Sequence, residues 1–158
     1  MARWQDVVES EPEFADAVLR LFDAAKHKTM ATIRADGGPR ISGIEANFSD
    51  GELWIGSMIG SRKSADLERD GRLALHSPSV PPPEGNETAW EGDAKLSGVA
   101  VKEDDPERLA TMGGGEGGGD LFRIDIHDVV LTRVDASGEY LEIKFWRPGK
   151  PLSTVKRA

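Results

Sequence analysis

The residues best suited to chemistry in this sequence lie in the stretch Gly60-Ser61-Arg62-Lys63. Gly60 allows a sharp turn, Ser61 is a good helix N-cap, and the first amides of the helix that follows point outward. A helix N-terminus carries partial positive charge, so Arg62 and Lys63 are each disfavoured there by roughly 0.3–1 kcal/mol. A bound phosphate would turn this repulsion into attraction. The spacing therefore predicts an anion site at Gly60 to Lys63.

The same stretch has a second interpretation as a solvated basic surface. Asp66 and Glu68 follow one turn later and are spaced to pair with Arg62 and Lys63. Spacing alone leaves both interpretations open.

Composition limits the classes of function. The chain has 158 residues, which fits one domain over residues 1–158, and a formal net charge of −8, which argues against nucleic-acid or anionic-membrane partners. Without cysteine there is no disulfide, thiolate metal site or cysteine nucleophile. The three histidines are too far apart in the sequence to indicate a metal site. No signal segment or long apolar run is present, so we expect a cytoplasmic protein.

One helix and several strands are expected to position the basic stretch. The helix is predicted over Ser10 to Ala25, with a capping box formed by Ser10 and Glu13 around Pro12. A short helix is predicted from the Asp104-Asp105-Pro106-Glu107 stretch to Met112. Strands are predicted over 29–34, 40–48, 52–57, 72–77, 93–101, 121–134 and 139–146, with a break near 127–128.

Two segments are expected to be irregular. Residues 79–92 contain three consecutive prolines, and the glycine run over 113–119 predicts a flexible loop. Six or seven antiparallel strands in a chain of this length favour a closed barrel over a sandwich, because closure removes exposed edges. The absence of βαβ alternation argues against a Rossmann domain.

The segments 30–40, 53–57, 60–63 and 70–75 resemble, in order and spacing, the split β-barrel flavin and deazaflavin proteins related to pyridoxamine 5'-phosphate oxidase. The resemblance implies a mainly β, six-stranded antiparallel split barrel. It also implies a homodimer with a phosphate-bearing cofactor at the interface. The residues that would contact that phosphate are Ser61, Arg62 and Lys63.

One strand departs from the family pattern. In the oxidase itself this strand supplies an arginine and a lysine to FMN, whereas here Ile41 to Asn47 contains neither. The resemblance therefore implies an oxidoreductase acting on a small organic substrate rather than a true pyridoxamine phosphate oxidase, with F420 as the first choice of cofactor and FMN as the second. The cofactor ring carries the hydride chemistry, so no catalytic acid or base is predicted. Ser57 is expected to hydrogen-bond to the ring edge.

Two alternatives remain open. Some members of the superfamily bind haem or biliverdin, and an axial haem ligand would then be His76 or His27. His76 ends a predicted strand close in sequence to the basic stretch and is expected to line the pocket. The other alternative is a non-catalytic flavin-binding protein. Among the tryptophans, Trp54 is predicted to pack in the core, and Trp90 and Trp146 to line a pocket or interface.

Overall fold

The computed structural model describes residues 1–115 and 118–158. Its helices are α1 (Trp4–Ser10), α2 (Pro12–Phe22), α3 (Arg62–Arg69), α4 (Pro106–Met112) and the 3₁₀ helix η1 (Glu87–Ala89). Its strands are β1 (Lys28–Ile33), β2 (Pro39–Ser49), β3 (Glu52–Ser57), β4 (Arg72–His76), β5 (Asp93–Lys102), β6 (Asp120–Val134), β7 (Leu141–Trp146) and β8 (Ser153–Arg157). No helix among the described residues is long and apolar enough to cross a membrane.

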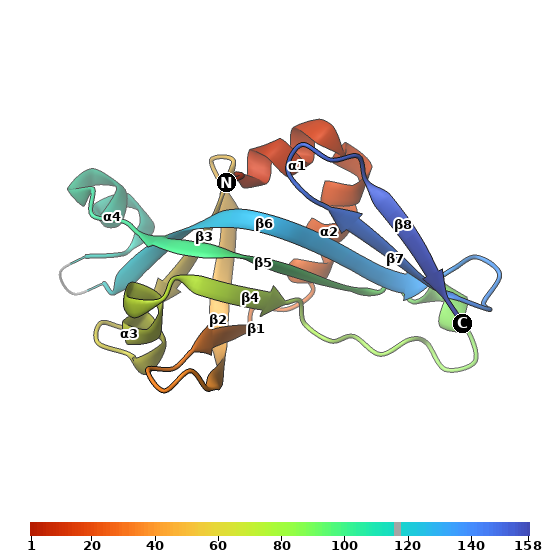
Figure 1. Ribbon diagram of the computed structural model, residues 1–158, viewed down its shortest axis with the longest axis horizontal. Helices are drawn as coiled ribbons and strands as arrows, with labels where there is room; N and C mark the ends of the chain where they lie inside the picture. The colour runs from red at the N-terminus through yellow and green to blue at the C-terminus, as the bar shows by residue number, and fades with distance from the viewer. Residues whose placement is uncertain (116–117) are drawn as a thin grey trace.

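Six strands close into the predicted antiparallel barrel (Figure 1). They follow the order β3-β2-β1-β4-β5-β6, and β3 pairs with the start of β6 to complete the ring. β6 is 15 residues long, so its first part closes the barrel while most of its length pairs with β5. Closure leaves no free edge among these six strands, which confirms the mainly β barrel.

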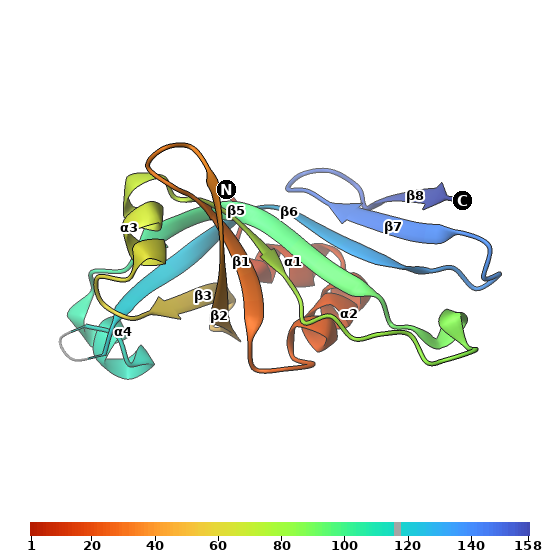
Figure 2. The ribbon, with the colours of Figure 1, turned by 90° about the horizontal axis from the view of Figure 1, so that it is seen from below.

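β7 and β8 extend the sheet from the second half of β6, beyond the barrel (Figure 2). β7 pairs with β6 from Val129 to Val134, and β8 pairs with β7. β8 was not predicted from the sequence. It is a short edge strand that is held by this pairing with β7.

The helix predicted over Ser10 to Ala25 is α2; α1, which precedes it, was not predicted, and the predicted capping box is wrong. Glu11 ends α1 and also precedes α2, because Pro12 has no amide hydrogen to continue the first helix. Ser10 does not cap α2: its Oγ donates to the carbonyl of Asp6 at 2.7 Å and accepts from Trp146 Nε1 at 2.8 Å. α2 ends at Phe22 rather than Ala25.

The core lies between the barrel and the two N-terminal helices. The ring of Phe48 on β2 packs edge-on against Trp4 of α1, with ring centroids 4.7 Å apart, and against Phe22 of α2 at 5.5 Å. Trp54 is buried as expected but lies outside the main core cluster. It occupies the opposite face of β3 from the core residues Leu53 and Ile55, since side chains alternate along a strand.

The break predicted in β6 is a β-bulge. The β5 to β6 register shifts between Ser97, which pairs with Asp128, and Gly98, which pairs with Ile126, so the residue between them is extra. That residue is His127. The predicted loop over 113–119 includes residues 116–117, which lie outside the described residues, and Gly113 ends α4 in the left-handed region with φ 76°.

Candidate functional site

The basic stretch begins α3 as predicted, with Ser61 as its N-cap. Gly60 has φ 69°, a left-handed conformation that favours glycine. The Ser61 Oγ accepts from the amide of Ser64 at 3.2 Å and lies 2.7 Å from the Oγ of Ser57 at the end of β3. This cap uses one of the free amides at the helix start, so the amides of Arg62 and Lys63 remain for a ligand.

The acidic residues one turn later do not pair with Arg62 or Lys63. Asp66 is bound by Arg40, with Nε to Oδ2 at 2.6 Å, and by Arg69, while Glu68 pairs with Lys102. Within the described residues, neither Arg62 nor Lys63 has a carboxylate within 4.0 Å. The predicted pairing of Arg62 and Lys63 with these two acids is therefore wrong.

Asp66 anchors α3 to the barrel instead. Its side chain is only 4% exposed, and Thr32 Oγ1 on β1 donates to it at 2.8 Å. Burial alone would raise the pKa of Asp66, but hydrogen bonds from Arg40, Thr32 and Arg69 together hold that pKa below its usual value. The carboxylate thus stays charged and fixes the helix to β1 and β2.

Lys63 lines a cavity of about 540 Å³ beside the start of α3. Ser57 of β3 lines the same cavity, as do Glu45 on β2 and His27, which precedes β1. Glu45 also contacts the two basic residues before β1, with Lys26 at 3.1 Å and His27 Nε2 at 3.7 Å. The structure therefore brings together two of the predicted site residues, Ser57 and Lys63.

Two glycines make one wall of this cavity flat. A Cβ atom built on Gly43 of β2 or Gly56 of β3 would meet no other atom within 4 Å. Gly56 pairs with Glu45 across the strands and with Leu121 of β6. A ring system could approach this backbone closely, so the donor set and the shape both fit a planar cofactor with a phosphate near Lys63.

Arg62 lies in a different place from Lys63. It lines a separate cavity of about 390 Å³, together with Arg34 and Arg40 of the β1 to β2 hairpin and Asp36 in its turn. Gly60 and Ser61 form the turn and the cap and are not among the residues that line the Lys63 cavity. The two cations of the motif thus face two neighbouring spaces.

His76 is not brought to the Lys63 cavity. It ends β4 and pairs with Thr29 of β1, whose other neighbour is Gly43 of β2, so β1 separates His76 from that cavity wall. Its Nδ1 lies 2.6 Å from the carbonyl oxygen of Ser77, and its Nε2 lies 3.8 Å from Asp93. Of the two histidines considered as haem ligands, His27 is the one that lines the cavity.

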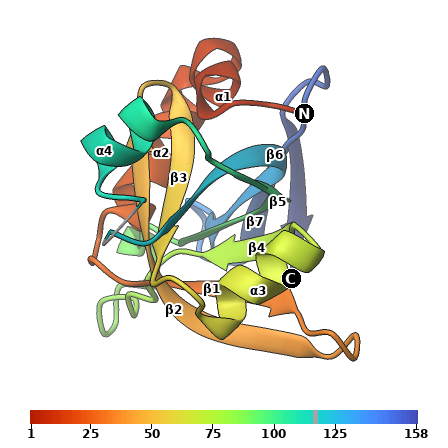
Figure 3. The ribbon, with the colours of Figure 1, turned by 90° about the vertical axis from the view of Figure 1, so that its left-hand side faces the viewer.

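Sequence reasoning missed the far wall of the site. Met112 at the end of α4 lines the cavity, as do Asp120 and Leu121 of β6, the strand that pairs with β3. α3 and α4 flank the same end of the barrel (Figure 3). These residues are about 50 positions from Lys63 in the chain, and no local pattern marks them.

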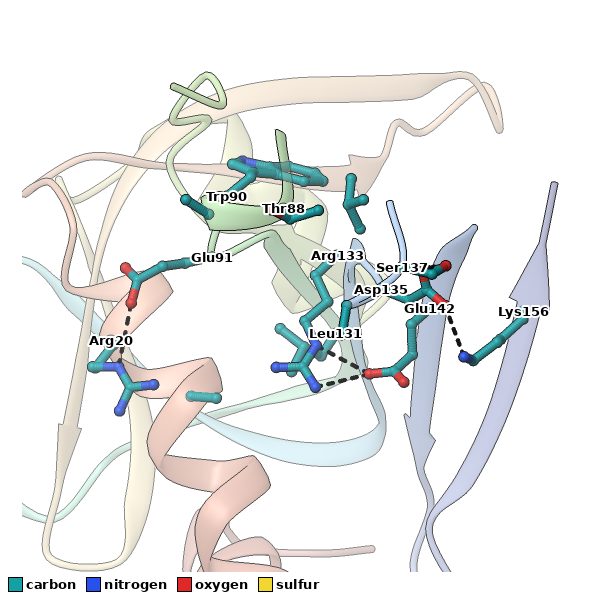
Figure 4. A pocket seen from close by; sticks show the side chains of 14 residues that line it. Arg20, Thr88, Trp90, Glu91, Leu131, Arg133, Asp135, Ser137, Glu142 and Lys156 are labelled. Carbon is teal, nitrogen blue, oxygen red and sulfur yellow. Dashed lines mark hydrogen bonds and ion pairs between the residues drawn. The ribbon is translucent and has the colours of Figure 1, made fainter. Parts of the chain in front are cut away.

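A further cavity of about 540 Å³ lies near the C-terminal end of β6, away from α3 (Figure 4). Its charged groups are paired within the protein: Arg133 Nη2 lies 2.9 Å from Glu142, and Lys156 Nζ lies 2.8 Å from Asp135. Trp90 lines this cavity, and its Nε1 donates to the carbonyl of Val80 at 2.7 Å. No free charge comparable to Lys63 is found among these residues.

The closed six-stranded barrel, with an N-capped α3 beside a cavity at one end, is the architecture of the FMN-binding split barrels. The profile of the pyridoxamine 5'-phosphate oxidase family matches residues 14–136, and the chain belongs to this family. No protein with a curated description matches the sequence significantly.

Several solved structures share the fold. PhzG from Burkholderia lata 383, in complex with tetrahydrophenazine-1-carboxylic acid, superposes with a TM-score of 0.64 at 16% identity over 99% of this chain and 96% of its own. A pyridoxamine 5'-phosphate oxidase-related, FMN binding protein from Nostoc punctiforme superposes with a TM-score of 0.62 at 11% identity, over 100% of this chain and 98% of its own. A heme binding protein from Mycobacterium smegmatis gives 0.53 at 13% identity over 89% of this chain and 57% of its own.

Proposed function

We propose that this protein binds a phosphorylated flavin-type cofactor, F420 or FMN, and acts as an oxidoreductase on a small organic substrate. One observation carries the proposal: Lys63, beside the capped start of α3, lines a cavity together with Gly43 and Gly56 and has no carboxylate partner among the described residues. FMN binding by a family relative of the same fold supports it.

The chain's residues have separate roles in this proposal. Lys63 and the amides at the α3 N-terminus hold the phosphate, through charge-assisted hydrogen bonds and the helix dipole. Gly43 and Gly56 let the ring lie against the backbone, and Ser57 offers a hydroxyl at its edge. When bound, such a cofactor supplies the hydride chemistry, while the protein orients it and excludes water.

We further propose that a second copy of the chain covers the open side of the site. Met58 and Ile59, in the turn before Gly60, are 76% and 63% exposed, and Ile41 on β2 is 75% exposed. Met58 lines the Lys63 cavity, and exposed large apolar side chains favour a protein interface over solvent. Sedimentation of the wild type beside Met58→Ser/Ile59→Ser tests this: a dimer that dissociates in the variant is expected, and a monomeric wild type contradicts it.

Haem binding is the second candidate. His27 lines the cavity and carries an imidazole that could ligate iron, and a heme binding protein shares the fold. A non-catalytic flavin-binding protein would use the same phosphate anchor, and only turnover of a substrate distinguishes it from the enzyme.

The test is an ultraviolet-visible spectrum of the purified protein, followed by titrations with F420, FMN and hemin monitored by tryptophan quenching. Saturable binding of F420 or FMN is the expected result and justifies a screen of small organic substrates. A sharp Soret band without any flavin binding would refute the oxidoreductase proposal and make His27 the central residue.

A further inference from the structure

Two buried polar atoms on β3 have no hydrogen-bond partner: Nε1 of Trp54 and Oε2 of Glu52. No other buried side-chain nitrogen or oxygen atom among residues 1–115 and 118–158 lacks a hydrogen-bond partner. Glu52 and Trp54 are two positions apart on the same strand, so both project from the face opposite the core.

Leaving these atoms unpaired is costly. A buried donor or acceptor without a partner destabilises the folded state, and such groups are rare in native proteins. Trp54 is 2% exposed, and its indole N–H can only donate. The neighbouring guanidinium groups do not supply Glu52 Oε2 with a bond. Arg3 Nε binds the other oxygen at 2.7 Å, and Arg123 Nη1 lies 3.8 Å away and donates to Asp125 instead.

Both residues line one cavity of about 430 Å³, which α4 and the N-terminal segment border. This volume lies in the range of small-molecule sites. The guanidinium of Arg108 on α4 lies over the Trp54 ring, 5.4 Å from its centroid, and Met112 adds an apolar wall. The cavity is thus bordered by the stacked Arg108 and Trp54 side chains and by the two polar atoms that have no hydrogen-bond partner.

The charges around this cavity exclude a phosphate or carboxylate as its preferred ligand. Four carboxylates face two guanidinium groups; the charged residues are Arg3, Arg108, Asp50, Glu52, Asp105 and Glu107. An anion would be repelled on balance, in contrast to the Lys63 cavity.

We propose that this cavity binds a neutral small molecule through a carboxamide or lactam group. The carbonyl oxygen accepts from Trp54 Nε1, and the adjacent N–H donates to Glu52 Oε2, so a single group satisfies both orphaned atoms. The cavity adjoins the cofactor cavity, because Met112 lines both, but it contains neither Lys63 nor Ser57.

The test is calorimetric titration of the full-length protein with two probes, nicotinamide as a carboxamide and uracil as a lactam. N,N-dimethylnicotinamide and 1,3-dimethyluracil are matched controls, because methylation removes the N–H donors and keeps the carbonyl groups. Trp54→Phe removes the indole N–H with its five-membered ring and keeps an aromatic side chain, and Glu52→Gln replaces the charged acceptor with a neutral one. Glu107→Gln is the charge control: it removes one negative charge from the cavity, as Glu52→Gln does, but leaves both atoms without partners unchanged.

Saturable binding of at least one probe is expected. Its dimethylated analogue should bind roughly tenfold more weakly, as should the probe to Glu52→Gln, because a hydrogen bond to a charged group is lost. Trp54→Phe should weaken binding by about fivefold, and Glu107→Gln should leave it unchanged. If Trp54→Phe fails to fold, the affinities of the wild type for each probe and its methylated analogue still test the proposal.

The proposal is overturned if the wild type binds neither probe, which would mean that water alone fills the cavity. Equal affinity for the methylated analogues would overturn it too. If the probe binds at low protein concentration but not at concentrations where the chain self-associates, a second copy of the chain occupies this face instead, and the proposal is overturned.

Discussion

The Nε of Arg40 donates a 2.6 Å hydrogen bond to Oδ2 of Asp66 and thereby ties β2 to the buried face of α3. This pairing removes the nearest acidic partner from Arg62 and Lys63. The acids of α3 thus hold the helix in place, and neither of them neutralises the cations at its positive end.

Replacing Asp66 with alanine should destabilise the fold. Thr32 and Arg40 would lose a buried acceptor, and we expect a loss of about 2–3 kcal/mol in the free energy of unfolding, below the range for a fully buried pair because Arg40 is 21% exposed. Urea denaturation measures it. Asp104→Ala, at an exposed position before α4, is the control, and equal stability of Asp66→Ala and wild type would contradict this role.

Acid should destabilise the protein through the same group. Hydrogen bonds lower the pKa of folded Asp66 despite its burial, and the side chain of Arg72 lowers the pKa of Asp70 to about 2. Below the ordinary value of 3.8 the unfolded chain therefore binds more protons than the folded one, so stability is full above that pH and is lost as pH falls through the folded pKa values.

Urea midpoints measured from neutral pH down to about pH 2 test this. The decline should be shallower in Asp66→Asn and Asp70→Asn, which have no proton to gain. An identical decline in both variants would show that other carboxylates cause it.

Gly56 is expected to be essential for cofactor binding and dispensable for folding. Its backbone is not in the left-handed region and a Cβ there meets nothing, so valine should be tolerated in β3. The valine side chain would occupy the ring's place and weaken F420 or FMN binding by roughly tenfold or more. Fluorescence titration and a melting curve check both parts, with Thr154→Val on exposed β8 as the control. Unimpaired binding in Gly56→Val would remove this wall from the site.

The barrel could be predicted because its signals are local. The turn residues before β3 predicted its bounds, from Glu52 to Ser57, as the structure has them. α1 and β8 could not be predicted, because distant partners stabilise them. Arg3 at the start of α1 pairs with Glu52 at 2.7 Å, and β8 is held by β7.

The site divides in the same way. Ser57, Ser61 and Lys63 lie within seven residues and were predicted together. In the structure Ser57 contacts Ser61 at 2.7 Å and lines the same cavity as Lys63. Met112 and Leu121 reach the cavity only because β6 pairs with β3 to close the barrel. His76 was placed near the site by its position in the chain, but the pairing of β4 with β1 sets it on the other side of β1.

The haem alternative makes a distinct prediction about the histidines. Since His27 lines the cavity and the Nδ1 of His76 lies against the Ser77 carbonyl, His27→Ala should abolish any axial ligation of hemin, and His76→Ala should preserve it. Soret spectra of the hemin-loaded proteins report the ligation. The opposite pattern would place haem outside this cavity.

The most direct test of the phosphate anchor compares Lys63→Ala with Arg62→Ala and with Lys150→Ala, an exposed lysine in the turn after β7. Losing a charge-assisted hydrogen bond costs about 1.5–3 kcal/mol, so the dissociation constant for F420 or FMN should rise by roughly 10- to 100-fold in Lys63→Ala. Arg62→Ala should have a smaller effect, because Arg62 faces the neighbouring cavity, and Lys150→Ala should have none. An unchanged dissociation constant in Lys63→Ala would contradict the phosphate anchor at the start of α3.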